Sequence, residues 1–278
     1  MMKIMKAQYD KSKVPEITPY FWFIKVLTTA MGESVSDYLV FHINPYAAVI
    51  LGAFGFVLAL ILQFSVRRYI AWVYWFVVLM VAVFGTMAAD VLHVVLGIPY
   101  VVTTSGFAIS VAVILVIWYA TEKTLSIHSI FTFRREIFYW AAVSATFALG
   151  TAAGDMTATT FGLGYLVSGL LFTALIFAML GGHIVKTGFL RRLQRQPRED
   201  VFFFWLAYIL TRPLGASFAD WMGKPVSWGA LGWGDDTAAI LFFIPMFFLV
   251  WHMASSRTDI KEQITTPQEE DGLAYPSK

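Results

Sequence analysis

Four aspartates occupy equivalent positions in four parts of the chain, and carboxylates in such a setting can bind a cation or a proton. Each position is defined by an aromatic–tryptophan pair, followed by a glycine ten residues and the aspartate fifteen residues after the tryptophan. The tryptophans are Trp22, Trp75, Trp140 and Trp205, and the aspartates are Asp37, Asp90, Asp155 and Asp220. Three residue types recurring at one spacing predict a fourfold tandem repeat.

The chain around these residues has the composition of a membrane protein. Of its 278 residues 58% are hydrophobic and only 14% are charged, whereas soluble domains carry about 25% charged residues. The lipid bilayer is therefore an expected partner. A net charge of +2 argues against a nucleic-acid partner, and the lack of cysteine excludes disulfides and thiolate metal sites.

Eight apolar segments, each about 20 residues long, predict an all-α bundle of eight transmembrane helices with two helices in each repeat. The expected spans are 18–40, 46–66, 69–95, 100–120, 137–158, 164–185, 201–222 and 236–254. They form one membrane domain over 18–254, with repeats at about 18–66, 69–120, 137–185 and 201–254. Polar tails are expected over 1–17 and 255–278.

The basic residues predict the orientation of this bundle. Eight crossings place 17 of the 20 Lys and Arg residues on one side, with Lys224 on the other and Lys25 and Arg212 inside spans. Because basic loops stay in the cytoplasm, we expect both termini there, in a multi-pass protein of the inner (plasma) membrane. The four repeats then run in parallel, with their tryptophans at the cytoplasmic interface and their glycines at helix contacts.

The aspartates need a polar environment, because an aspartate at the centre of a membrane helix costs about 2.5–3.5 kcal/mol. They are therefore expected to converge inside the bundle. Residues one helical turn away share their face. We predict that the substrate or cation binds to Glu33, Asp37, Asp90, His93, Asp155 and Asp220, with support from Lys25, Thr86, Thr151, Arg212 and Ser217.

The ligand types favour a hard or borderline divalent cation such as Mn²⁺, or a proton, and no other cofactor. The residues proposed to hold a metal are Glu33, Asp37, Asp90 and His93. Lys25 and Arg212 are expected to act as counter-charges that pair with acids on neighbouring helices. The alternative is a structural network in which the buried charges only satisfy one another.

Several longer motifs resemble an uncharacterised bacterial family of multi-pass inner-membrane proteins, built from four tandem two-helix repeats of unknown function, each with a characteristic tryptophan. They are VPEITPYFWFIKVLTTAMGES (14–34), TEKTLSIHSIFTFRREIFYW (121–140), FALGTAAGD (147–155), FGLGYL (161–166) and AYILTRPLGAS (207–217). The resemblance implies the fold and the membrane location. The third repeat departs from the family pattern, because AGDMTATTFG lacks the glutamate that tends to follow the aspartate. The polar loop at 121–136 is expected to dock against the helix ends.

These observations predict a transporter, an exporter of a small cation, and not an enzyme. One alternative is a membrane sensor or receptor for cations or pH that transports nothing. Another is an intramembrane hydrolase, because Gly154-Asp155 is similar to the Gly-Asp of membrane aspartyl proteases, although the second motif of those enzymes is missing. Gly181-Gly182 would permit a homo-oligomer.

Overall fold

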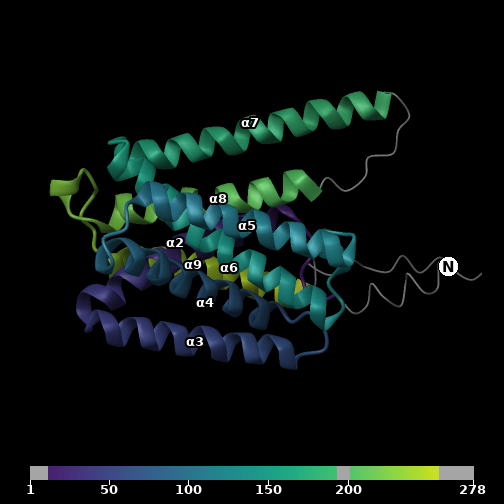
Figure 1. Ribbon diagram of the computed structural model, residues 1–278, viewed down its shortest axis with the longest axis horizontal. Coiled ribbons are helices and arrows are strands. Elements are labelled where there is room, and N and C mark those ends of the chain that lie inside the picture. The colour runs from purple at the N-terminus through teal and green to yellow at the C-terminus, as the bar shows by residue number, and fades with distance from the viewer. Residues whose placement is uncertain (1–11, 193–200, 257–278) are drawn as a thin grey trace, which may run out of the picture.

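Eight long helices lie side by side in the computed structural model, which describes residues 12–192 and 201–256 (Figure 1). This part of the chain contains no strand, so the prediction of an all-α bundle of eight helices is confirmed for it. The rest of the two expected tails, at 1–11 and 257–278, lies outside the described residues. The helices are α2 (Pro19–His42), α3 (Pro45–Ser65), α4 (Ala71–Asp90), α5 (Tyr100–Glu122), α6 (Phe133–Asp155), α7 (Gly164–Arg192), α8 (Val201–Gly223) and α9 (Asp235–Ser256).

Polar caps and prolines fix the first residues of several helices. The Thr18 hydroxyl accepts a hydrogen bond from the Phe21 backbone N–H at 3.3 Å, and Pro19 opens α2. Asn44 caps α3 in the same way, ahead of Pro45. A side-chain acceptor satisfies an N–H that has no partner within the helix, and proline fits the first turn because it has no N–H. The starts expected from the sequence lie within a few residues of these.

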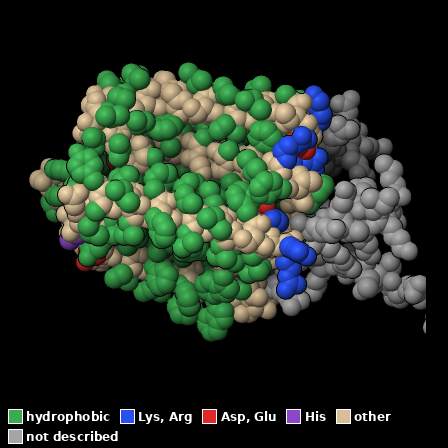
Figure 2. Space-filling view, turned by 60° about the horizontal axis from the view of Figure 1, so that its bottom comes forward, with side chains coloured by type: hydrophobic (Ala, Val, Ile, Leu, Met, Phe, Trp, Pro, Cys, Tyr) green, Lys and Arg blue, Asp and Glu red, His purple; other side chains and the backbone are tan. Residues whose placement is uncertain are grey.

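Seven of the eight described helices are long and apolar enough to cross a membrane. The remaining helix, α2, carries three buried charged side chains in its span, Lys25, Glu33 and Asp37. Apolar side chains predominate along the helices on the face shown in Figure 2, and many large apolar side chains are exposed. The protein is therefore a multi-pass membrane protein in which α2 is shielded by its neighbours.

The helices form two layers that follow the repeat. The first helices of the four units, α2, α4, α6 and α8, form a closed ring in which each contacts the next and α8 contacts α2. The second helix of each unit packs outside the ring, mainly against the first helix of the following unit. Thus α3 packs on α4, α5 on α6, α7 on α8, and α9 returns to α2. This circular arrangement confirms the tandem repeat.

The aromatic–tryptophan pairs tie the ring together at one level. The aromatic residue of each pair contacts the tryptophan of the next unit, with ring centroids 5.5–6.3 Å apart, and the fourth unit closes on the first. The contacts are Phe21 with Trp75, Tyr74 with Trp140, Tyr139 with Trp205, and Phe204 with Trp22. Three of the tryptophans are buried and Trp22 is half-buried. These indoles therefore hold helices together, and their expected position at the cytoplasmic interface stays a prediction.

The repeated glycines lie where neighbouring inner helices approach most closely. A Cβ atom added to each glycine would overlap, or press tightly against, a residue of the next inner helix. In every case the contacted residue lies seven positions after the tryptophan of that next helix. The contacts are Gly32 with Ala82, Gly85 with Phe147, Gly150 with Arg212, and Gly215 with Thr29. The glycines therefore permit close helix packing, as the sequence predicts.

This packing predicts a large loss of stability for Gly32→Leu. The new side chain would collide with the Cβ atom and backbone of Ala82, and the cost of overpacking is about 1–3 kcal/mol or more. The matched control is Gly106→Leu in α5, where a Cβ meets nothing within 4 Å. We expect thermal unfolding in detergent to show a lower midpoint for Gly32→Leu only. Equal midpoints would contradict the close contact of α2 with α4.

Lys and Arg side chains gather at one end of the described bundle (Figure 2). Short segments close this end. Lys13 forms a 2.6 Å ion pair with buried Glu136 of α6, and the loop between α5 and α6 buries Ile127 and Ile130. The Trp205 indole donates a hydrogen bond to the Leu125 carbonyl of the same loop. The loop therefore docks on the helix ends, as expected, and the assignment of this end to the cytoplasm stays a prediction.

Candidate functional site

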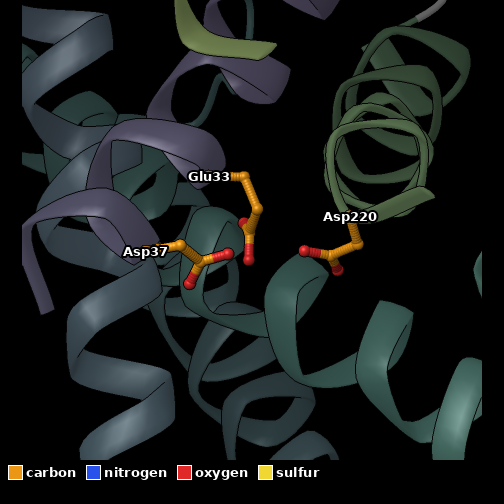
Figure 3. A group of neighbouring side chains, drawn as sticks. All are labelled: Glu33, Asp37 and Asp220. Carbon is orange, nitrogen blue, oxygen red and sulfur yellow. The ribbon is translucent and has the colours of Figure 1, made fainter. Parts of the chain in front are cut away.

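Three carboxylates meet between α2 and α8, toward the end of the ring opposite to the aromatic contacts. Glu33 and Asp37 project from successive turns of α2 toward Asp220 of α8 (Figure 3). One oxygen from each lies within 4.8 Å of the other two, and all three residues are buried. Of the four residues proposed as metal ligands, the structure brings together only Glu33 and Asp37, and it adds Asp220.

Arg212 closes the centre of the ring beside this cluster. Its Nη2 atom lies 2.6 Å from Glu33 and also donates to the hydroxyls of Thr86 and Thr151, while Nη1 donates to the Thr29 carbonyl. Glu33, Thr86 and Thr151 occupy the same repeat position, so one guanidinium joins α8 to all three other inner helices. Arg212 has no exposed surface. The expected pairing of Arg212 with an acid on a neighbouring helix is thus present.

Lys224, directly after α8, supplies a second cation. Its Nζ atom lies 2.5 Å from an Asp37 oxygen and 3.8 Å from an Asp220 oxygen. Burial by itself lowers the pKa of Lys224, but the Asp37 and Asp220 carboxylates outweigh it and raise the pKa well above its ordinary value. The lysine is therefore charged at neutral pH. Lys224 was expected only to lie in an outer loop, although its spacing of four residues from Asp220 is a recognisable pairing signal.

Asp90 and Asp155 lie on the other two inner helices and are half-buried. They are close enough to interact electrostatically with each other and with Glu33 and Asp37. Among the described residues, neither carboxylate forms an ion pair within 4 Å or a hydrogen bond. Each ends its α-helix and is followed by a π-helical turn, Val91–Val95 or Met156–Thr160. Such turns are rare and are frequent at functional sites.

Two other expected site residues have different partners. His93 lies 2.8 Å from the Ile98 carbonyl through Nδ1 and stacks on the Tyr100 ring at 3.5 Å, so it anchors the turn before α5. It is not part of the carboxylate group. Lys25 is 1% exposed and pairs with no acid in the described chain; its Nζ atom faces the Tyr208 and Phe147 rings at 4.0 and 4.4 Å. Cation–π contacts thus replace the expected ion pair.

Ser217, one turn before Asp220, is buried, and its hydroxyl has no hydrogen-bond partner among the described residues. Ser34 holds the equivalent repeat position one turn before Asp37, and its hydroxyl is also buried without a described partner. Ser217 was among the expected site residues, whereas Ser34 was not. The repeat itself could have identified Ser34, because both serines lie twelve residues after their tryptophans.

A model of one protein family matches the chain four times. Its description is Repeat of Unknown Function (DUF347), and the matches cover residues 20–69, 73–124, 138–188 and 203–258. The chain belongs to the DUF347 family. Each DUF347 repeat corresponds to one inner and one outer helix of the structure. No curated protein and no solved structure matches the chain.

The charges of this DUF347 site do not balance. Five carboxylates, from Glu33, Asp37, Asp90, Asp155 and Asp220, surround two paired cations, Arg212 and Lys224. Fully ionised, the group would carry an excess of three negative charges. Buried charge of one sign is costly unless it is neutralised. The arrangement can therefore take up protons or bind small cations.

Proposed function

We propose that this DUF347 protein transports a small cation across the membrane, and that the acidic group is its binding site. The cation is a divalent metal ion such as Mn²⁺, exchanged for protons, and the direction is export. The observation that carries the proposal is the excess of carboxylates over cations at one end of the inner ring. Carboxylate oxygens are the ligands that hard divalent cations prefer.

Asp90 and Asp155 separate this proposal from a purely structural network. The pairs of Glu33 with Arg212 and of Asp37 with Lys224 would be enough to join α2 to α8 and its following turn. Two more carboxylates add repulsion from the neighbouring acids, which attraction to Lys224 and Arg212 offsets only in part, and they form no described ion pair within 4 Å. Intramembrane acids that bring no structural benefit are typical of ion and proton pathways.

The same geometry supports alternating access. In the proposed mechanism, Arg212 at the centre of the inner ring and the aromatic contacts nearer the basic end form the seal. The half-buried Asp90 and Asp155 lie on the other side of this seal. In the proposed cycle a cation or proton neutralises the acids, the Arg212–Glu33 contact loosens, and the seal opens toward the basic end. Carboxylates that bind cation and proton in turn would couple the two movements.

Reconstitution of the purified protein into liposomes tests this function. A metal-sensitive dye and a pH-sensitive dye inside the vesicles report the entry of Mn²⁺, Zn²⁺, Co²⁺, Ni²⁺ or Mg²⁺ and the opposite movement of protons. We expect at least one ion to enter faster than in protein-free liposomes, together with a pH change. Binding without flux for every ion and pH gradient would overturn the proposal and favour the cation sensor.

A further inference from the structure

The ammonium group of Lys224 lies where a cation would bind. Its Nζ atom is 2.5 Å from Asp37 and 3.8 Å from Asp220, and only about a tenth of the side chain is exposed. The backbone holds the residue in place, because the Lys224 N–H donates to the Asp220 carbonyl and Gly232 donates to the Lys224 carbonyl. The side chain itself can swing away without moving this backbone.

The surrounding oxygen atoms suit a divalent cation. Oxygen ligands lie about 2.0–2.6 Å from Mg²⁺ or Ca²⁺, so ligands of one ion are at most about 5 Å apart. One oxygen each from Glu33, Asp37 and Asp220 meets this limit, since these three atoms lie within 4.8 Å of one another. Independently of the acids, the buried hydroxyls of Ser34 and Ser217 lack partners in the described chain and lie one turn from two of them. Buried polar atoms normally have a hydrogen-bond partner, and an ion with its water ligands would supply one here.

We propose that Lys224 is a tethered substitute for the transported cation, so that a divalent ion binds between Glu33, Asp37 and Asp220 only when the Lys224 ammonium leaves. This inference rests on the proposed function and names the site and its control. The lysine neutralises the empty site and prevents the acids from holding an ion too tightly. The lysine competes for the site because its ammonium already contacts the Asp37 and Asp220 oxygens that would hold the ion.

Phe41 gives the displaced side chain a place to rest. The Nζ atom lies 5.1 Å from the centre of the Phe41 ring, which is itself exposed. A long lysine stem can lie along such a ring while its ammonium stays near water. In the proposed exchange, Lys224 is released by rotation of its side chain along this ring toward the outer surface.

Equilibrium binding of Mn²⁺ to the detergent-solubilised full-length protein tests the competition. The electron paramagnetic resonance signal of free Mn²⁺ gives the bound fraction directly. We expect Lys224→Gln to bind Mn²⁺ at least tenfold more tightly than the wild type at pH 7.5, because it removes the competing charge. Lys224→Arg should bind like the wild type, and adding Asp37→Asn to Lys224→Gln should abolish the gain.

Lys13→Gln is the matched control, because Lys13 also pairs with a buried acid, Glu136, but at the opposite end. It should leave Mn²⁺ affinity unchanged. Lys224→Met replaces Lys224→Gln if the latter fails to elute as a single species. Equal or weaker binding after loss of the lysine charge would overturn the inference even if liposomes show flux. If Lys224→Gln binds Mn²⁺ more tightly but liposomes show no flux, the inference about Lys224 is upheld and only the transport proposal is overturned.

Discussion

Replacing Arg212 with methionine should cause the largest loss of stability of any single substitution in the ring. The change would leave buried Glu33 with a hydroxyl donor and no cation, and it would break the contacts that join α8 to α2, α4 and α6. Removing one partner of a buried ion pair costs about 3–5 kcal/mol in soluble proteins. We expect a clear fall in the thermal unfolding midpoint of the detergent-solubilised protein and a lower yield from membranes.

Two further variants test whether the loss of stability comes from the buried ion pair of Arg212. Arg134→Met breaks an ion pair with Glu122 in which the arginine is largely exposed, and such pairs are worth about 0–1 kcal/mol. Its midpoint should stay near that of the wild type. The double variant Arg212→Met/Glu33→Gln should recover part of the loss, because no buried charge is left alone. If Arg212→Met is no less stable than Arg134→Met, Arg212 does not hold the inner helices together.

The architecture could be predicted because it follows from a repeated local pattern. The spacing from Trp22 to Gly32 and Asp37 recurs in every unit, and a two-helix unit with one orientation can repeat only in parallel. Helix length then follows from membrane thickness. The pattern did not specify which helix of another unit packs against each helix. The structure shows that Gly32 contacts Ala82 of the following unit, a relation that a single helix face does not specify.

The partners of the charged residues were harder to predict, because the four repeats differ from one another at these positions. The four aspartates are equivalent in sequence, yet Asp37 and Asp220 share Lys224 whereas Asp90 and Asp155 have no described ion pair. Lys224 has no basic counterpart in the other units; for example, the first unit has Phe41 at the equivalent position. A repeat predicts the features that its copies share, so it cannot predict the contacts of residues that differ between the copies. In this protein those residues determine the electrostatics of the site.

The same asymmetry makes Asp90 and Asp155 the residues that best test the proposed transport. If the acidic group binds the transported cation, Asp90→Asn/Asp155→Asn should lower the initial rate of metal entry into liposomes by at least a hundredfold. Asparagine keeps the shape of each side chain and removes the two carboxylates that form no described ion pair within 4 Å. The excess charge of the fully ionised group falls from three to one, which leaves little attraction for a divalent ion. Folding should be unaffected, because no ion pair is lost.

Asp236→Asn is the matched control for this variant. Asp236 lies in the first turn of α9, outside the group of Glu33, Asp37 and Asp220, so its loss should leave the rate close to that of the wild type. Each single variant, Asp90→Asn and Asp155→Asn, should lower the rate less than the double variant. Insertion is checked by the yield and elution volume of each protein. Full metal flux through the double variant would show that the ion does not pass these carboxylates, whatever the wild type transports.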